Sequence, residues 1–482
     1  MSGYRYPPNE AMGVMMGLSR AQLTSLGLSL VIFIMAAMSN RLMVGLMAAP
    51  LVAVLGAGQW AGVPFRSRIG TRLGWVSSTR SRRYRVPVGR QRTLKQVPPC
   101  LSGYRVRPVD GLGDWAAGPA PGLVATRGLT SMVLPTEGPQ MALRGAAGVD
   151  SQLREWGELL GGLCTERAEG GVARISWTDV HSAADTSDAY RYHRSHGQTG
   201  PASSEYERHL ASFSAATSTH QSFVTVTLST GTARRRQTLS ERSKADYVTA
   251  TIEQTQSVAR ELTARGYRAG RPESALAITD LVRRLGDPWR TRRSELSATE
   301  RLGVPERAEE LPLSIVNERL YVSIDSAVHR AYQINWPARE VPGDWMWELL
   351  AAAEGPKITT VVFEPVAPSA SRRRVEHQLT RLQSDAQVEH HRKNRVSARR
   401  QAMAAAVQER ERELVAGHME MEVFGIVVMT ARDVASLETR CQRLERAAAR
   451  CGGARLRPLD TLHDVGWAAA LPIGMPVGRP TS

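Results

Sequence analysis

Two long apolar stretches lie close together near the start of the chain, before any other regular pattern. Residues 21–38 and 42–63 contain no acidic or basic side chain, and three polar residues separate them. A helix that crosses a bilayer takes about 20 apolar residues, within a usual range of roughly 17–25. The pattern therefore predicts a transmembrane helical hairpin over residues 21–63, preceded by a cytoplasmic lead at residues 1–20.

After the hairpin, the periodicity becomes that of a folded α+β body. In the first predicted soluble domain, residues 97–290, strands are expected at 104–109, 122–126, 173–178 and 222–228, and helices at 151–167, 240–266 and 273–285. Residues 181–203 are polar and lack periodicity, which predicts a loop. The charged, irregular stretch 288–312 marks the expected domain boundary.

The second predicted soluble domain, residues 313–475, repeats an order of strands and helices. Strands are expected at 320–324, 331–336, 358–364, 422–430 and 454–457, and helices at 343–353 and 433–449. Strands joined by helical crossovers favour an open ferredoxin-like sandwich. The fold class expected for the chain is therefore α+β, with a transmembrane hairpin followed by a cytoplasmic ferredoxin-like body.

One long helical segment stands out within the second predicted domain. Residues 371–416 lack Gly and Pro and carry two apolar seams at 3.5-residue spacing, with the polar run 389–395 between them. We expect a helical arm. It is either one continuous helix or, as the slightly favoured alternative, an antiparallel hairpin folded near Asn394.

Charge is concentrated at the N-terminal end of the chain. Residues 1–100 carry 13 basic and one acidic side chain, whereas the other 382 residues carry 49 basic and 45 acidic ones. The juxtamembrane segment 64–96 holds a basic collar formed by Arg66, Arg68, Arg72, Arg80, Arg82, Arg83 and Arg85. Because basic residues stay on the cytoplasmic side, this collar predicts that both termini are cytoplasmic. Membrane lipid is its expected partner, and nucleic acid is the less favoured alternative.

The sequence motifs of common catalysts are missing. There is no G-x-x-x-x-G-K-[ST], G-x-S-x-G, H-E-x-x-H or EF-hand loop, and no cysteine pair has the spacing of a zinc or redox motif. His377, His390 and His391 are expected on a solvated helix face, and Asp114 and Asp179 have no catalytic partner at a useful spacing. The sequence therefore predicts no catalytic residue, no cofactor and no metal site.

Several segments resemble proteins of bacterial type IV secretion, or conjugation, systems. The hairpin, with its lead GYRYPPNE and basic exit, resembles their small PrgI-like membrane component. Segments similar to the N-terminal, pre-motor half of the conjugation ATPases are 153–166 (LREWGELLGGLCTE), 173–179 (ARISWTD), 222–228 (SFVTVTL), 258–270, 327–350 and 358–376. The closing GWAAALPIG, residues 466–474, is similar to the segment that leads into the motor domain of those ATPases.

The resemblance implies a non-enzymatic scaffold in the inner membrane of an actinobacterium, within a type IV secretion-like machine. Expected partners are membrane lipid, other membrane subunits of the system and further copies of the chain. A separately encoded ATPase is also expected, because the motor motif is missing. Two alternatives stay open: an EccE-like component of type VII secretion, and a membrane-tethered DNA-binding protein that uses the basic collar.

Overall fold

The computed structural model describes residues 20–39, 42–57, 59–60, 63–64, 83–85, 97–111, 113–126, 128–138, 145–167, 171–183, 187–197, 200–216, 218–229, 244–289, 311–336, 341–351, 355–391 and 398–475. They fall into two compact units. Unit 1 takes in the described parts of Ser81–Pro365 and Met421–Gly478, and unit 2 those of Pro8–Arg80 and Val366–Glu420.

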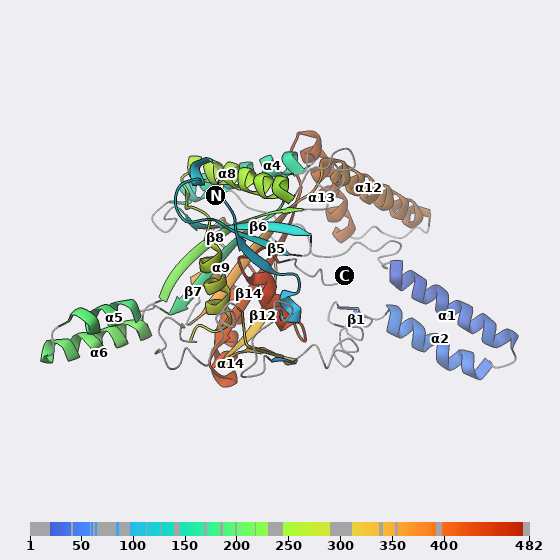
Figure 1. Ribbon diagram of the computed structural model, residues 1–482. Coiled ribbons are helices and arrows are strands. Elements are labelled where there is room, and N and C mark those ends of the chain that lie inside the picture. Colours follow the sequence, from blue (N-terminus) through green and yellow to red (C-terminus); the bar gives the residue numbers. More distant parts are fainter. Residues whose placement is uncertain are drawn as a thin grey trace. The chain divides into compact units, whose positions relative to one another are not determined.

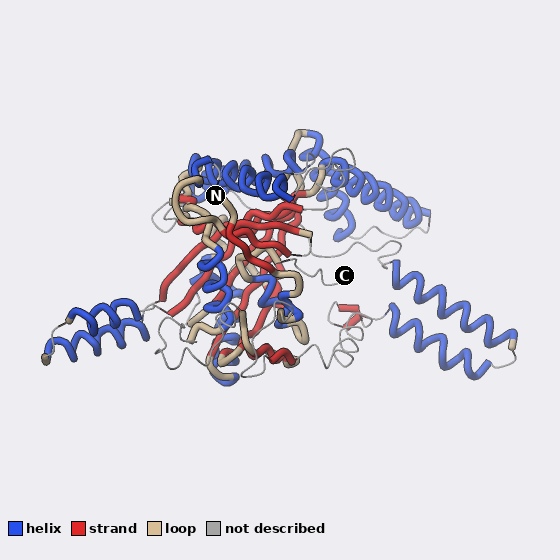
Figure 2. Tube along the Cα trace, in the orientation of Figure 1, coloured by secondary structure: helices blue, strands red, loops and turns tan. Residues whose placement is uncertain are grey.

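Unit 1 is built on one antiparallel sheet, which counts 13 strands among the described residues (Figures 1 and 2). The strands are β3 (Arg83–Arg85), β4 (Arg105–Pro108), β5 (Gly122–Thr126), β6 (Leu129–Glu137), β7 (Val172–Ala183), β8 (Ser218–Ser229), β9 (Arg268–Ala269), β10 (Ser314–Asn317), β11 (Val322–Ile324), β12 (Ala327–Asn335), β13 (Lys357–Pro365), β14 (Met421–Ala431) and β15 (Arg455–Pro458). Their order is β3-β10-β11-β12-β14-β13-β7-β8-β6-β5-β4, with β15 beside β12 and β9 beside β6.

The helices of unit 1 connect these strands. They are α4 (Ala146–Arg167), α5 (Ser187–His196), α6 (Pro201–Ala216), α8 (Lys244–Ala264), α9 (Ala275–Gly286), α11 (Trp347–Ala351), α14 (Val434–Arg450) and α15 (His463–Ala470), with the short 3-10 turns η1 (Pro99–Leu101) and η2 (Gly113–Trp115). Figure 1 shows α5 and α6 as two neighbouring helices inserted between β7 and β8.

The sheet consists of two structural repeats. From β10 to β4, the strand order reads the same outward from the central pair β13 and β7. The first repeat runs β4-β5-β6-α4-β7-α5-α6-β8-α8-β9-α9, and the second follows the same plan from β10 to α15. Each repeat contains a β-α-β-β-α-β unit, with strand order β9-β6-β8-β7 in the first and β15-β12-β14-β13 in the second.

The strand registers place the two repeats about a pseudo-twofold axis. The nine residues of β6 are equivalent to the nine residues of β12. When the strand registers of the two repeats are followed from this pair to β7 and β13, Thr178 of the first repeat is equivalent to Thr360 of the second. These two threonines also face each other across β7 and β13, with their Oγ1 atoms 3.1 Å apart. Because Thr178 pairs with its own equivalent, Thr360, the pseudo-twofold axis passes between these two residues.

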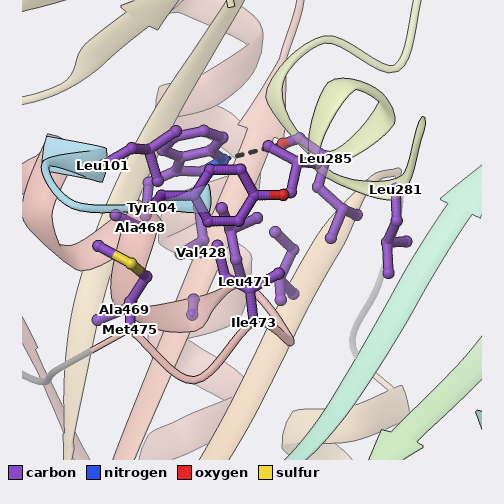
Figure 3. Packing of buried hydrophobic residues seen from close by; sticks show 14 of the residues in the cluster. Leu101, Tyr104, Leu281, Leu285, Val428, Ala468, Ala469, Leu471, Ile473 and Met475 are labelled. Carbon is purple, nitrogen blue, oxygen red and sulfur yellow. Dashed lines mark hydrogen bonds between the residues drawn. The ribbon is translucent and has the colours of Figure 1, made fainter. Parts of the chain in front are cut away.

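Three cores cover the two faces of the sheet. One face buries α9 and α15 together, in a central core that takes residues from both repeats. The other face carries α4 and α8 over the first repeat, and α11 and α14 over the second. Figure 3 shows Leu285 of α9 gathered with Leu471 and Ile473 in the central core. Trp467 of α15 is completely buried there, and its indole N–H donates to the Leu285 carbonyl at 3.0 Å.

Unit 2 consists of two pairs of helices and a short strand pair. Its elements are α1 (Arg20–Met38), α2 (Leu42–Ala57), β1 (Gln59–Trp60), β2 (Val63–Pro64), α12 (Pro368–His391) and α13 (Ala398–Val415). α1 contacts α2, and the Ser29 hydroxyl donates to the Ala49 carbonyl at 2.6 Å. The predicted arm is divided into α12 and α13, which contact each other as the favoured hairpin alternative expects.

The predicted transmembrane hairpin is wrong. In the second apolar run helix α2 ends at Ala57, and the described residues beyond it, Gln59, Trp60 and Val63, lie in strands β1 and β2. The 16 residues of α2 rise about 24 Å, short of the roughly 30 Å of a bilayer core. α1 has 19 residues, begins at Arg20, and interrupts its apolar run with Gln, Thr and Ser. No helix among the described residues combines the length and apolarity needed to cross a membrane. This finding overturns the predicted two-span location in the bacterial inner membrane, with both termini cytoplasmic.

The predicted body needs a second correction. The α+β class holds, but the last third of the chain does not form a sandwich of its own. It contributes six of the 13 strands, β10 to β15, to a sheet that continues from β13 into β7 of the first repeat. The separate soluble domains of the prediction are therefore replaced by one long antiparallel sheet, in which the β-α-β-β-α-β unit of ferredoxin-like folds occurs twice.

Trp467→Ala should lower the free energy of unfolding by about 3–5 kcal/mol, because it removes a large, fully buried side chain from the core that joins the repeats. Urea unfolding followed by circular dichroism measures this loss. Trp347→Ala is the matched control: this side chain is 58% exposed, and its removal should change stability by less than about 0.5 kcal/mol. Equal losses in both variants would contradict the placement of α15.

Acid should weaken the fold through a second buried group, His329. Its Nε2 lies 2.7 Å from the Gly286 carbonyl and must donate, so the neutral ring accepts from the Thr430 hydroxyl at Nδ1. Burial lowers the pKa of His329 to about 4, and burial also lowers the pKa of His463 to about 4. The unfolded chain binds these protons first, so the free energy of unfolding should fall as pH drops from about 6.5 toward 4.

His329→Gln should reduce this pH dependence, because the glutamine amide can donate to the same carbonyl without titrating. His463 keeps its own contribution to the dependence in this variant. Urea unfolding at pH 7.5 and pH 5 measures the difference. An unchanged pH dependence in the variant would contradict a neutral, buried His329.

Candidate functional site

The end of β7 and the start of β8 bring together three ionisable side chains. Asp179 and His181 are two residues apart on β7, so both side chains lie on the same face of the sheet. His220 on β8 is the direct cross-strand partner of His181, and Ser222 is that of Asp179. Paired residues on neighbouring strands point to the same face, so the register itself assembles the group.

The carboxylate of Asp179 is the centre of this cluster. Its Oδ2 atom lies 2.7 Å from Nε2 of His220 and 3.3 Å from Nε2 of His181. Its Oδ1 atom accepts a hydrogen bond from the Ser222 hydroxyl at 3.0 Å. The ring centroids of the two histidines lie 4.4 Å apart, with the rings nearly perpendicular. Asp179 is buried, His181 is largely buried, and the side chain of His220 is 53% exposed.

The two histidines determine the ionisation of this carboxylate. Burial alone would raise the pKa of Asp179, but its contacts with His181 and His220 outweigh burial and hold the pKa at about 2. In turn, the hydrogen bond to Asp179 raises the pKa of His220 above its ordinary value, against the opposing effect of burial. The Asp179 carboxylate is therefore ionised at neutral pH and contacts both imidazoles.

A lysine lies on the next strand. Lys357 of β13 is the cross-strand partner of His181 and is completely buried. Its ammonium donates to the carbonyls of Leu349 and Leu350, at 2.8 and 2.7 Å. Burial lowers the pKa of Lys357 to about 8, although the charge of Asp179 acts in the opposite direction. The lysine is thus tied to the end of α11, and its charge lowers the pKa of His220 slightly.

His220 also lines a cavity of about 620 Å³ between β6, β8 and α9. Its charged lining residues are Glu137, Arg268, Glu273, Asp280 and Arg284. Burial raises the pKa of Glu273, and the neighbouring charge of Arg284 partly offsets this rise. The cavity therefore offers a polar, solvent-connected space beside the most exposed member of the cluster.

Among the described residues, those singled out from the sequence do not gather into a site, with the exception of Asp179. Arg66, Arg68, Arg72, Arg80 and Arg82 of the basic collar lie outside the described residues. Arg83 and Arg85 lie on β3 with exposed side chains, next to β10. Asp114 is exposed in η2 and His377 is exposed on α12, whereas the side chains of His390 and His391 are outside the described set.

Asp179 is the exception, since the sequence left it without partners. The predicted strands end at Thr178 and start again at Ser222, which puts His181 and His220 in loops. The signal that could have found the cluster is the alternation in Asp179-Val180-His181, which continues the strand pattern of the preceding residues.

Comparison of the chain with known protein families and with curated proteins finds no match in either set. The chemistry of the cluster therefore rests on its geometry alone. Two imidazole nitrogens and a carboxylate oxygen within one small volume can bind a cation or share a proton.

Asp179→Asn should lower the pKa of His220, because the variant removes both the negative charge and the strongest acceptor of its ring N–H. Titration of the histidine ring protons by nuclear magnetic resonance measures the change. An unchanged His220 titration would contradict the contact.

Proposed function

We propose that the protein is a non-catalytic docking component of a type IV secretion-like, or conjugation-like, system, and that its sheet-based body binds a separately encoded ATPase. The proposal starts from the sequence resemblance to the pre-motor half of conjugation ATPases. The sequence lacks the phosphate-binding loop motif. A motor activity would then come from another polypeptide, which we propose as the partner.

The arrangement of the resembling segments supports the proposal. They form α4, β7, β8, the end of α8 with β9, the stretch from β12 to α11, and β13 with the start of α12. Most of them are therefore central elements of unit 1 and neighbours in one sheet. Segments that resemble one domain of another protein should lie together in the fold. Most of these segments do so, although they are far apart in the sequence.

The closing segment GWAAALPIG is part of the same core. Trp467, Leu471 and Ile473 are buried in it. Gly474 has a φ of 66°, and a side chain there would collide with the hydroxyls of Ser131 and Thr227 in the first repeat. The next residue, Met475, accepts a hydrogen bond through its carbonyl from Arg174 at 2.8 Å. Residues 466–474, which resemble the segment that leads into a motor domain, thus pack against strands of the first repeat.

Trp347 is the observation that carries the docking proposal. In the resembling stretch GDWMWELL, Trp345 is buried against Trp336, and Leu349 is fully buried. Trp347 lies between them on α11 and is 58% exposed. A large aromatic side chain that stays in solvent beside buried neighbours is typical of a binding hot spot. We assign it to the ATPase-facing surface.

The pair α1 and α2 gives the proposal a second contact. Its exposed large apolar side chains range from 36% exposure at Leu26 to 82% at Met38. Apolar surface gathered in this amount on one element marks an interaction site. In the proposal it packs against other protein subunits of the secretion system.

Co-purification tests the docking role. The tagged full-length chain should retain the secretion ATPase encoded beside it. Trp347→Ala should weaken that retention by about tenfold or more, since loss of a hot-spot tryptophan costs about 2 kcal/mol or more of binding. Quantitative pull-down with the purified ATPase gives the affinity.

Tyr192→Ala is the matched control, because Tyr192 is an exposed aromatic side chain on α5, outside the resembling segments. It should bind the ATPase like the wild type. Two results would remove the proposal: hydrolysis of ATP by the isolated chain, or ATPase binding that is absent from the wild type.

A further inference from the structure

Asp179, His181 and His220 form a constellation that the fold does not require. The pseudo-twofold axis at Thr178 and Thr360 gives each of them a counterpart in the second repeat. These counterparts are Val361, Phe363 and Val423, and Phe363 pairs with Val423 as His181 pairs with His220. The same place in the second repeat is therefore apolar. Burying a carboxylate and an imidazole where valine and phenylalanine suffice costs stability, unless the polar groups have a ligand or a task.

The cluster also leaves buried polar atoms without hydrogen bonds. Nε2 of His181 is buried and, although 3.3 Å from the Asp179 carboxylate, makes no hydrogen bond of sound geometry with any described residue. On the opposite strand Thr359 pairs with Asp179, and its buried hydroxyl likewise lacks a hydrogen-bond partner among the described residues. Buried polar groups in folded proteins nearly always make good hydrogen bonds, so a buried imidazole nitrogen that meets a carboxylate only at 3.3 Å, outside hydrogen-bond geometry, points to an additional ligand between them.

The donor set selects the ligand. One atom from each of Asp179, His181 and His220 lies within 4.8 Å of the other two. Two imidazole nitrogens and one carboxylate oxygen suit zinc and its neighbours, whereas magnesium and calcium prefer oxygen ligands alone. Atoms bound tetrahedrally at about 2.1 Å are roughly 3.4 Å apart, so the 2.7 Å contact between Asp179 and His220 has to open slightly. His220 has room to move, because half of its side chain is in solvent.

The surroundings supply the outer contacts that metal ligands usually have. The Ser222 hydroxyl donates to Oδ1 of Asp179, which orients the carboxylate and leaves Oδ2 facing the two histidines. The buried ammonium of Lys357, on the neighbouring strand β13, donates to the carbonyls of Leu349 and Leu350, which leaves Oδ2 of Asp179 to the two histidines. His220 lines the cavity beside β8, and its half-exposed side chain gives solvent access to the site.

We propose that Asp179, His181 and His220 bind one divalent transition-metal ion of the zinc class, with a further coordination position open to solvent. Asp179 and His181 lie near the C-terminal end of β7, and His220 lies near the start of β8. The bound ion ties these two strands together where the chain leaves the sheet for α5 and returns from α6. This site is independent of the proposed docking function.

Metal binding to the purified, chelator-treated full-length chain tests the proposal. Isothermal titration with Zn²⁺ should give one tight site per chain. Co²⁺ should give the intense visible absorption of a four- or five-coordinate ion with nitrogen ligands. His220→Ala should weaken Zn²⁺ binding by about 100-fold and abolish the Co²⁺ bands, and Ser222→Ala should weaken binding by about tenfold through the carboxylate it orients.

The design separates a built site from adventitious binding. His209→Ala removes an exposed imidazole on α6 and should leave both readouts unchanged. His220 is half exposed, so its variant should fold, and its circular dichroism spectrum checks this point. The proposal is overturned if Co²⁺ shows only the weak absorption of a six-coordinate aqueous ion. It is equally overturned if His220→Ala and His209→Ala bind Zn²⁺ alike.

Discussion

The pairing of β7 with β13 is the interaction on which the rest of unit 1 depends. Each strand lies at the edge of its own repeat in the strand order, so each would be an unpaired sheet edge if the repeats were separate. Their antiparallel ladder runs from the pair Ile175 and Phe363 to the pair His181 and Lys357. It turns two short sheets into one. The joined face then receives α9 from one repeat and α15 from the other, and the central core contains side chains of both.

Comparison of equivalent positions in the two repeats distinguishes residues that both repeats need for folding from residues that only one repeat carries. Positions that are apolar in both repeats, such as Phe223 and its counterpart Ile426, serve the shared core. Positions that differ are free to carry function. The polar group at Asp179 in the first repeat replaces an apolar patch of the second, and the helical insertions at the equivalent connections differ in length and charge. The two proposals draw on such differences: an exposed tryptophan on α11 and a histidine pair on β7 and β8.

Local pattern predicts much of this fold. The expected strand at 122–126 coincides with β5, and the expected helix at 273–285 is α9 within two residues at its start. Alternation and 3.6-residue periodicity report burial directly, which explains these successes. The nine-residue strand β6 was missed, since its Pro135 and flanking glycines imitate a loop. The polar stretch expected as a loop contains α5 instead.

What the sequence could not supply is the long-range pairing. The order of the strands, the axis at Thr178 and the cluster at Asp179 depend on which strands meet and in which register, and such pairings join residues far apart in the chain. The hairpin error has a different cause. An apolar composition up to Val63 was equated with a helix of that length, but the helix ends at Ala57. Length of an apolar run limits the length of a helix and does not determine it.

Native-state hydrogen exchange tests the central claim, that the two repeats form one cooperative body joined at β7 and β13. The amides of the central ladder, for example those of Val180 and Ile358, should exchange with the same opening free energy as the buried turns of α9 and α15, because all of them open only when the shared core does. If the strands of one repeat open at a clearly lower free energy than those of the other, the repeats are separate units, and the ladder between β7 and β13 does not join them into one body.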